Sequence, residues 1–502
     1  MPDDRKTGMV RLRPTQGRPP DASMTAAAPT STAGPAPRRS NGVLAAFSAA
    51  CLPYAALGLP LYVTLPEFYA SHVGVDLAVV GLVFLIIRMA DIVIDPALGM
   101  VIDRTNSRFG RYRLWMGLAA PVLMLAVGML FMARPGAGPA YLTLWLVVLS
   151  LGFSVSLLSQ VSWASALSSD YNQRSRIYGW WQTANIVGVL AVLMVPVLVQ
   201  NMGWGDYARA VQWQGWFIII ALPVALAITF AFTPEPPPGP ATAAETRFGY
   251  LALFKLPVLQ RLLGADLALG VARGVVGALF FYFFEAARGF ERAETSILLL
   301  VYFVFGLFGA PAWSWLAVRL GKHRALIWAC VYFAVTLMFA AFLAPALVGP
   351  AEAALEAVTG APAPYADLLM AGLMVALVGL AFASGDLLLR AMMADVSDQV
   401  RLDDGADRTG LLFSILTATS KLGYAVSVLT FAGLQMAGFD PGLGGENSGS
   451  ALIWLQIMFA GLPALCLLLA ALALHRYPLD QARHAEIRAE LEARGPAPQG
   501  NP

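Results

Sequence analysis

Long apolar segments alternate with short polar loops along most of the chain. Twelve segments reach the ~20 residues that a helix needs to cross a bilayer, and they cover residues 43–69, 77–102, 114–133, 140–167, 177–200, 211–232, 258–286, 294–318, 325–346, 365–392, 409–435 and 451–474. The segments end at proline, glycine or charge clusters, such as RPGAGP at residues 134–139. The pattern predicts an all-α membrane protein with twelve transmembrane helices.

Composition and the two ends of the chain support this class. Hydrophobic residues make up 58 % of the chain and charged residues 13 %, and the mean hydropathy is +0.66. Soluble domains carry about 25 % charged residues. Residues 1–40 are rich in proline, alanine and arginine without the apolar core of a signal peptide, which predicts a disordered cytoplasmic tail. The alternating charges of HAEIRAELEARG, at 484–495, predict a short exposed helix in a second tail, 476–502.

The loops indicate orientation and an internal repeat. Lysine and arginine concentrate in the loops after the second, fourth, sixth, eighth and tenth segments, so both termini are predicted to be cytoplasmic. A proline-rich cytoplasmic linker, 233–257, separates two six-helix bundles, 41–232 and 258–475. The motif R-x-G-[RK]-x-R follows the second segment (108–113) and the eighth (319–324). Two repeated halves predict a central cavity and a rocking motion around it.

Three charged residues interrupt the second apolar segment. Arg88, Asp91 and Asp95 have spacings that place them on one stripe of a helix. A charge in the middle of a bilayer costs about 2.5–3.5 kcal/mol, so such residues are usually functional. Two carboxylates one turn apart stay ionised only beside cations. The stripe predicts a cation site, with a static salt-bridge network between the halves as the alternative.

Several motifs resemble one transporter family. The sequence Gly99-x3-Asp103-Arg104-x3-Arg108-x-Gly110-Arg111 resembles the signature loop of the major facilitator superfamily, a charged latch between cytoplasmic helix ends. Four further features, spread over both halves, resemble the glycoside–pentoside–hexuronide:cation symporters, the melibiose-permease-like family: R-x2-D-x3-D-P-x2-G at 88–99, RAMMADVSD at 390–398, DRTG at 407–410 and Lys421. The resemblance covers residues 41–475. It implies the twelve-helix major facilitator fold and the inner membrane of a bacterium.

The resemblance implies roles for particular residues. It assigns cation binding to Asp91, Asp95, Ser154 and Lys421, with Na⁺ possible at the two carboxylates and H⁺ as the alternative. A lysine ammonium beside two carboxylates competes with a cation for the same field. Coupling and gating are assigned to Arg88, Asp103, Arg104, Arg108, Arg111, Asp395 and Arg408.

The solute site departs from the melibiose pattern. Residues Tyr54-Ala55 and Leu157 stand where that pattern has acids that hold sugar hydroxyls, and Asp386 stands in place of a tryptophan. The candidate solute-binding residues are Trp181, Gln182, Asn185, Arg273, Asp386, Arg390 and Thr417. Simpler roles remain open: an interfacial tryptophan, an Asp386–Arg390 pair, and a pair of Arg273 with Asp266.

The function predicted is symport of a cation, Na⁺ or H⁺, with a sugar, glycoside or uronate by alternating access. The alternative is cation-coupled transport of another solute, such as a lysolipid or another organic anion. The sequence has no nucleophile–base pairing, metal-ligand cluster or phosphate-binding loop, which argues against an enzyme and against ATP-driven transport. The expected partners are a small solute and the lipid bilayer, with no nucleic acid, no cofactor beyond the coupling ion, and a monomeric state.

Overall fold

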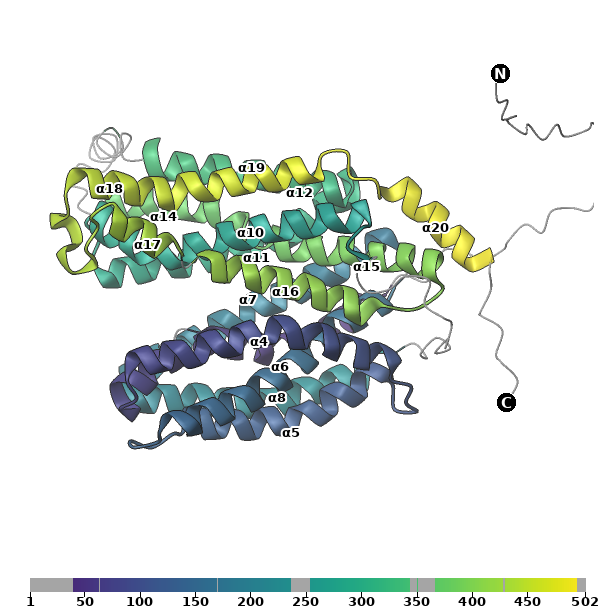
Figure 1. Cartoon of the computed structure of the whole chain (residues 1–502), viewed down its shortest axis with the longest axis horizontal. Coiled ribbons are helices and arrows are strands. Elements are labelled where there is room, and N and C mark those ends of the chain that lie inside the picture. Colours follow the sequence, from purple (N-terminus) through teal and green to yellow (C-terminus); the bar gives the residue numbers. More distant parts are fainter. Residues whose placement is uncertain are drawn as a thin grey trace, which may run out of the picture. The chain divides into compact units, whose positions relative to one another are not determined.

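The computed structural model describes residues 39–343 apart from 63, 169 and 236–252, residue 350, and residues 366–493 apart from 428. Figure 1 shows the chain from its N-terminal helices in purple to its C-terminal helices in yellow. Most of the predicted tail 1–40, most of the linker 233–257 and residues 494–502 of the second tail lie outside the described residues.

The N-terminal half provides six helical spans. The first consists of α1 (Asn41–Ala49), α2 (Cys51–Tyr62), α3 (Thr64–Phe68) and the π-helical turn η1 (Tyr69–Val73). The other five are α4 (Leu77–Arg104), α5 (Arg111–Phe131), α6 (Pro139–Ala166), α7 (Tyr171–Asn201) and α8 (Tyr207–Phe232). Within this half α5 packs against α6 and α8, α2 against α7, and α4 against α6.

The C-terminal half repeats this plan and adds a terminal helix. Its spans are α10 (Pro257–Tyr282) with η2 (Phe283–Ala287), α11 (Arg292–Leu320), α12 (Lys322–Met338) with η3 (Phe339–Leu343), α14 (Ala366–Leu380) with α15 (Ser384–Asp404), α16 (Thr409–Ser427) with α17 (Leu429–Met436), and α18 (Gly449–Gln456) with η5 (Ile457–Gly461) and α19 (Leu462–Leu474). A 3-10 turn, η4 (Pro441–Glu446), follows α17, and α20 (Gln481–Ala493) follows α19. Here α10 packs against α16 and α19, and α11 against α14.

The helices have the length and surface of membrane spans. Eleven spans in the described part of the chain are long and apolar enough to cross a bilayer. The remaining span is α4, whose 28 residues carry the predicted charge stripe. Large apolar side chains face outward from the bundles, for example Val93, which is 75 % exposed. Such surfaces suit lipid rather than water, in agreement with the twelve predicted segments.

Two of the helix crossings between the halves occupy equivalent places in the repeat. The second span, α4, packs along the eleventh, α16, and the eighth, α11, packs along the fifth, α7 (Figure 1). At the first crossing a Cβ on Gly99 would lie 2.5 Å from the carbonyl oxygen of Gly410. At the second, a Cβ on Gly179 would lie 3.0 Å from the hydroxyl oxygen of Ser314. Small residues therefore allow close approach of the two halves.

The repeated R-x-G-[RK]-x-R motif forms the same turn in each half. Gly110 immediately precedes α5 with φ +95°, and Gly321 precedes α12 with φ +88°. Glycine adopts this left-handed region without the steric cost that a Cβ would add. The turns place Arg111 and Lys322 at the first positions of their helices. The sequence echo therefore corresponds to a structural repeat.

Candidate functional site

The predicted cation-site residues lie together at the crossing of α4 and α16. The Lys421 ammonium lies 3.0 Å from Oδ2 of Asp91 and 2.7 Å from Oδ2 of Asp95. It also lies 3.5 Å from the hydroxyl oxygen of Ser154 on α6. All four side chains are buried, and Asp95 is 0 % exposed. The ammonium comes from the C-terminal half and the carboxylates from the N-terminal half, so this contact ties the halves together.

A further hydroxyl completes the group. Ser150, one turn before Ser154 on α6, donates a hydrogen bond of 2.5 Å to Oδ1 of Asp91. The sequence prediction omitted Ser150, although its i, i+4 spacing to Ser154 could have indicated it. Oδ1 of Asp95 is buried and has no hydrogen-bond partner among the described residues. Carboxylate and hydroxyl oxygens suit a hard cation such as Na⁺, and either carboxylate can take a proton.

A second contact between the halves lies at the end of α4. The Asp103 carboxylate accepts hydrogen bonds from the backbone N–H groups of Gly410 (2.7 Å) and Leu411 (2.9 Å) at the start of α16. A carboxylate at this position is favoured by the helix dipole and by the free N–H groups. Arg111 lies 2.9 Å from Asp407 in the loop before α16. Burial acts to raise the pKa of Asp407, but the Arg111 guanidinium and hydrogen bonds from Thr409 outweigh it and lower the pKa.

A third contact joins α7 to α15. The Arg174 guanidinium lies 2.6 Å from Asp398 and 3.2 Å from Asp395, and it donates to the carbonyl of Ala394 at 2.8 Å. The Lys322 ammonium lies 2.6 Å from the other oxygen of Asp395. We call the end of the bundles that carries these contacts the latch end, and its residues are Asp103, Arg111, Arg174, Lys322, Asp395, Asp398 and Asp407.

The predicted boundary after residue 392 was wrong. Asp395 and Asp398 were expected beyond the helix, but α15 continues to Asp404. Their charges are compensated by Arg174 and Lys322, so the helix remains buried past the predicted end. Among these four, only Asp395 was predicted as a gating residue. Lys322 could have been found from the repeat, because it stands at the position of Arg111.

The other predicted gating residues lie on α4 and in the loops that follow α4 and α15. Arg104 is exposed, and Arg108 lies over the ring of Phe109 at 4.8 Å. Arg408 lies 2.6 Å from Asp404 across the turn between α15 and α16. Arg88 is half-buried on α4, one turn before Asp91.

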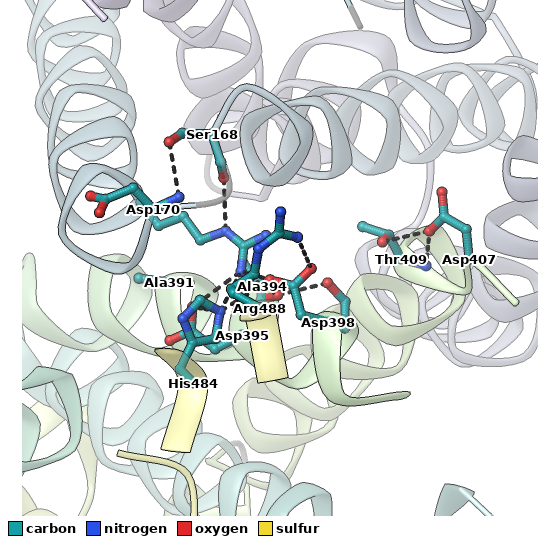
Figure 2. A network of polar contacts seen from close by, with 12 residues as sticks. Ser168, Asp170, Ala391, Ala394, Asp395, Asp398, Asp407, Thr409, His484 and Arg488 are labelled. Atoms are coloured by element: carbon teal, nitrogen blue, oxygen red, sulfur yellow. Dashed lines mark hydrogen bonds and ion pairs between the residues drawn. The ribbon is translucent and has the colours of Figure 1, made fainter. Parts of the chain in front are cut away.

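Helix α20 is present as predicted, but the expectation that it is exposed was wrong. Its His484 and Ile487 are buried, and α20 packs against α15 and α7. The His484 ring nitrogen lies 3.0 Å from Asp398, and Arg488 lies 3.8 Å from the same carboxylate. Figure 2 shows both side chains directed at the α15 carboxylates. The alternating charges concealed one buried face, on which His484 and Ile487 are three residues apart.

Four predicted solute-site residues form a separate charged group between the halves. The Arg273 guanidinium on α10 lies 2.6 Å from Asp386 on α15, and Arg390 lies 3.8 Å from the same carboxylate. The Arg390 guanidinium stacks over the ring of Trp181 on α7 at 4.5 Å. We call Trp181, Arg273, Asp386 and Arg390 the arginine cluster. The expected pairing of Arg273 with Asp266 was wrong, because Asp386 is the partner and Asp266 accepts from Ser420 at 2.8 Å.

The remaining candidate solute-binding residues differ in their burial and in the hydrogen bonds that they make. Gln182 is buried next to Trp181 in the sequence. Asn185 donates to the carbonyl of Trp181 at 2.8 Å, and Thr417 donates to the carbonyl of Phe413 at 2.8 Å, so both use their own helix backbone. A hollow of about 660 Å³ lies elsewhere, lined by residues between 124 and 141 of α5, α6 and their loop, and none of the candidate residues lines it.

Comparisons with known proteins agree with this architecture. The family described as MFS/sugar transport protein matches residues 46–481. The chain is 24 % identical to the inner membrane symporter YicJ of Escherichia coli (strain K12), over 82 % of this chain and 85 % of that protein. It is 23 % identical to the isoprimeverose transporter of Lactiplantibacillus pentosus, over 85 % of this chain and 86 % of that protein.

A solved structure supports the fold. The major facilitator superfamily proton:xylose symporter XylE, bound to 6-bromo-6-deoxy-D-glucose, superposes with a TM-score of 0.62 at 14 % identity. The match covers 89 % of this chain and 98 % of that one. The predicted fold, twelve transmembrane helices in two six-helix bundles, is therefore confirmed.

Proposed function

The chain belongs to the MFS/sugar transport protein family, and on that premise we propose that it is a secondary active transporter coupling Na⁺ or H⁺ to the movement of a sugar, glycoside or uronate. The names of its relatives support coupled transport and a carbohydrate solute, since they include a symporter and an isoprimeverose transporter. We further propose that it resides in the inner membrane of a bacterium and that the latch end and both termini face the cytoplasm.

The observation that carries the proposal is the position of Lys421 between Asp91 and Asp95. Without an ion, the ammonium neutralises much of the field of the carboxylates and bridges the two halves. A cation that enters the site replaces this charge and frees the lysine. One charge moving through 100 mV is worth ~2.3 kcal/mol, or about 50-fold accumulation of a neutral solute.

Helix α16 connects the proposed cation site to the proposed solute site. Its Lys421 contacts the carboxylates, while the preceding Ser420 donates to Asp266 on α10. The two helices are closely packed, because a Cβ on Gly423 would lie 2.9 Å from the backbone of Gly270. A displacement of Lys421 would therefore be transmitted to α10, the helix that also carries Arg273 of the arginine cluster.

Alternating access requires the latch end to open. In the structure it is tied by Asp103 at the start of α16, by the Arg111–Asp407 pair and by Arg174 on α15. These contacts describe a state closed toward the proposed cytoplasmic side. In the proposed cycle the ion and solute bind first, the halves rock, and these contacts separate so that both are released inward.

Uptake into proteoliposomes tests the proposal. The purified protein would be given a panel of labelled sugars, glycosides, uronates and a lysolipid under a Na⁺ gradient, a pH gradient or neither. We expect a carbohydrate to accumulate only with an ion gradient and Asp91→Asn to abolish the accumulation, while Asp206→Asn, an exposed carboxylate at the start of α8, leaves it unchanged. Accumulation without any ion gradient would overturn ion coupling. Preference for the lysolipid would replace the carbohydrate with the alternative solute.

A further inference from the structure

The arginine cluster has more buried hydrogen-bond donors than acceptors. Arg273 is 5 % exposed and Trp181 is 3 % exposed. Among the described residues, Nη2 of Arg273, Nε of Arg390 and Nε1 of Trp181 are buried without an acceptor. Buried donors are normally satisfied, so these three predict a ligand that brings acceptor oxygens.

The charges of the cluster point to an anion. Two guanidinium groups share the single carboxylate of Asp386, at 2.6 Å from Arg273 and 3.8 Å from Arg390. The next carboxylate, Asp266, has both oxygens 2.8 Å from the Ser420 hydroxyl. The Asp386 side chain is the most accessible member of these ion pairs, at 23 %, so a solute can reach the cluster beside it. Nη1 and Nε of Arg273 already donate to Asp386 and to the carbonyl of Leu269, so Nη2 of Arg273 and Nε of Arg390 are the donors that remain for a carboxylate.

Charge balance across both sites limits the charge of that anion. The two groups and the residues beside them contain four positive and four negative side chains: Arg88, Arg273, Arg390, Lys421, Asp91, Asp95, Asp266 and Asp386. One bound Na⁺ or H⁺ adds a positive charge, and uncompensated buried charge is costly. A monoanionic solute restores neutrality, whereas a phosphate monoester, at about −1.5 to −2 near pH 7, exceeds it.

We propose that the arginine cluster binds the carboxylate of a sugar acid, so that the transported solute is a monoanionic carbohydrate that moves with one cation. This inference rests on the function proposed above and selects among its solutes. The free Nη2 of Arg273 and Nε of Arg390 donate to the carboxylate, and Trp181 on α7 lies where the rest of the sugar would contact the N-terminal half. Because solute and ion carry opposite charges, their joint transport moves no net charge.

Matched ligand pairs test the proposal. The full chain, purified in detergent, would be titrated with glucuronate against glucose, galacturonate against galactose, and glucose 6-phosphate, with tryptophan fluorescence and melting temperature as readouts. We expect at least one acid to bind tenfold or more tightly than its neutral counterpart and than the phosphate. If no acid exceeds its neutral counterpart, or if the phosphate binds most tightly, the proposal is overturned.

Variants separate binding from folding. Arg273→Gln should remove most of the preference for the acid, and Arg273→Lys, which keeps the charge but loses the fork, should remove part of it. Arg209→Gln, an exposed arginine at the start of α8, serves as the control and should keep the full preference. An unchanged preference in a folded Arg273→Gln would overturn the assignment.

The ion response distinguishes this inference from the function on which it rests. If the melting temperature does not respond to Na⁺ or pH, the proposed symport fails. If it responds but neutral sugars bind as tightly as the acids, only the inference fails. In proteoliposomes, uptake of the acid should be insensitive to an imposed membrane potential, and uptake that increases several-fold with an inside-negative potential would contradict the charge balance.

Discussion

Replacing Lys421 with alanine perturbs the proposed cation site at its centre. The ammonium lies within 3.0 Å of both carboxylates, and all three groups are buried. The substitution leaves two carboxylates one turn apart without their nearest positive charge. The variant should therefore be less stable than the wild type when no ion is bound. It should also bind the coupling ion more tightly, because the Lys421 ammonium no longer competes with the ion for the carboxylates.

The size of both effects follows from the same contact. Breaking a buried pair by removing one partner costs about 3–5 kcal/mol. Binding of the coupling ion removes most of that cost, so the affinity for the ion should increase by the same free energy. At about 1.4 kcal/mol for each tenfold change, the increase is roughly 100- to 3,000-fold. Tighter binding slows ion release, so transport should fall.

Melting temperature in detergent provides the assay. Wild type and Lys421→Ala would be compared over a NaCl series balanced with choline chloride, and over a pH series. The variant should melt well below the wild type without ion and approach it at low concentrations of the coupling ion. Lys322→Ala is the matched control, since Lys322 is a buried lysine that is paired with Asp395 at 2.6 Å and lies outside the proposed cation site. It should lose stability without recovering it when the ion is added.

The comparison of the two lysines decides the outcome. If both variants respond to the ion as the wild type does, Lys421 does not compete with a cation, and the two carboxylates belong to a static network. The same conclusion follows if Lys421→Ala is destabilised but no concentration of Na⁺ or H⁺ restores its melting temperature.

Three further predictions concern the latch end and the crossing of the halves. Gly99→Ala should reduce uptake more than tenfold because its Cβ would lie 2.5 Å from a carbonyl oxygen, whereas Gly81→Ala on the same helix has open space and should transport normally. His484→Ala should accelerate amide hydrogen exchange in the last turns of α15, and His484→Gln should largely retain protection; equal exchange in the two variants would refute a role for the polar contact with Asp398. The lowered pKa of Asp407 means that its pair with Arg111 stabilises the fold fully above the unfolded pKa near 3.9 and loses that contribution only as pH falls through the lower folded value. Asp407→Asn should therefore lower the melting temperature at pH 6, and this loss should shrink only below about pH 4; a variant that melts with the wild type at pH 6 would contradict this.

The sequence predicted the fold because each span carries its own signal. Apolar length identified the spans, and the motif around Gly110 and Gly321 identified the repeat, since a left-handed turn needs glycine in either half. The carboxylates of the proposed cation site could also be found in the sequence, because charged residues are rare on an apolar helix. Asp91 and Asp95 could be singled out from the sequence without knowledge of the residues that lie beside them in the fold.

Residues whose roles depend on a distant partner were harder to predict. Arg174 resembles any positive loop residue until α15 is known to lie beside it, and Ser150 is one of many serines in an apolar helix. The charge pattern of α20 concealed a face that is buried only because α7 and α15 meet there. Arg273 was a candidate from the sequence, but its partner, Asp386, comes from another helix. Such contacts depend on tertiary packing, which periodicity does not report.

Calorimetric titration of the coupling ion measures whether Asp95 is needed to bind it. Wild type, Asp95→Asn and the control Asp206→Asn would be titrated with Na⁺, and proton uptake would be measured in buffers of different ionisation enthalpy. Wild type and Asp206→Asn, which changes an exposed carboxylate, should each bind one Na⁺ or take up one proton. Asp95→Asn should do neither, because Asp95 is the fully buried carboxylate of the pair. Binding of the same ion by Asp95→Asn, with unchanged stoichiometry and affinity, would contradict the account.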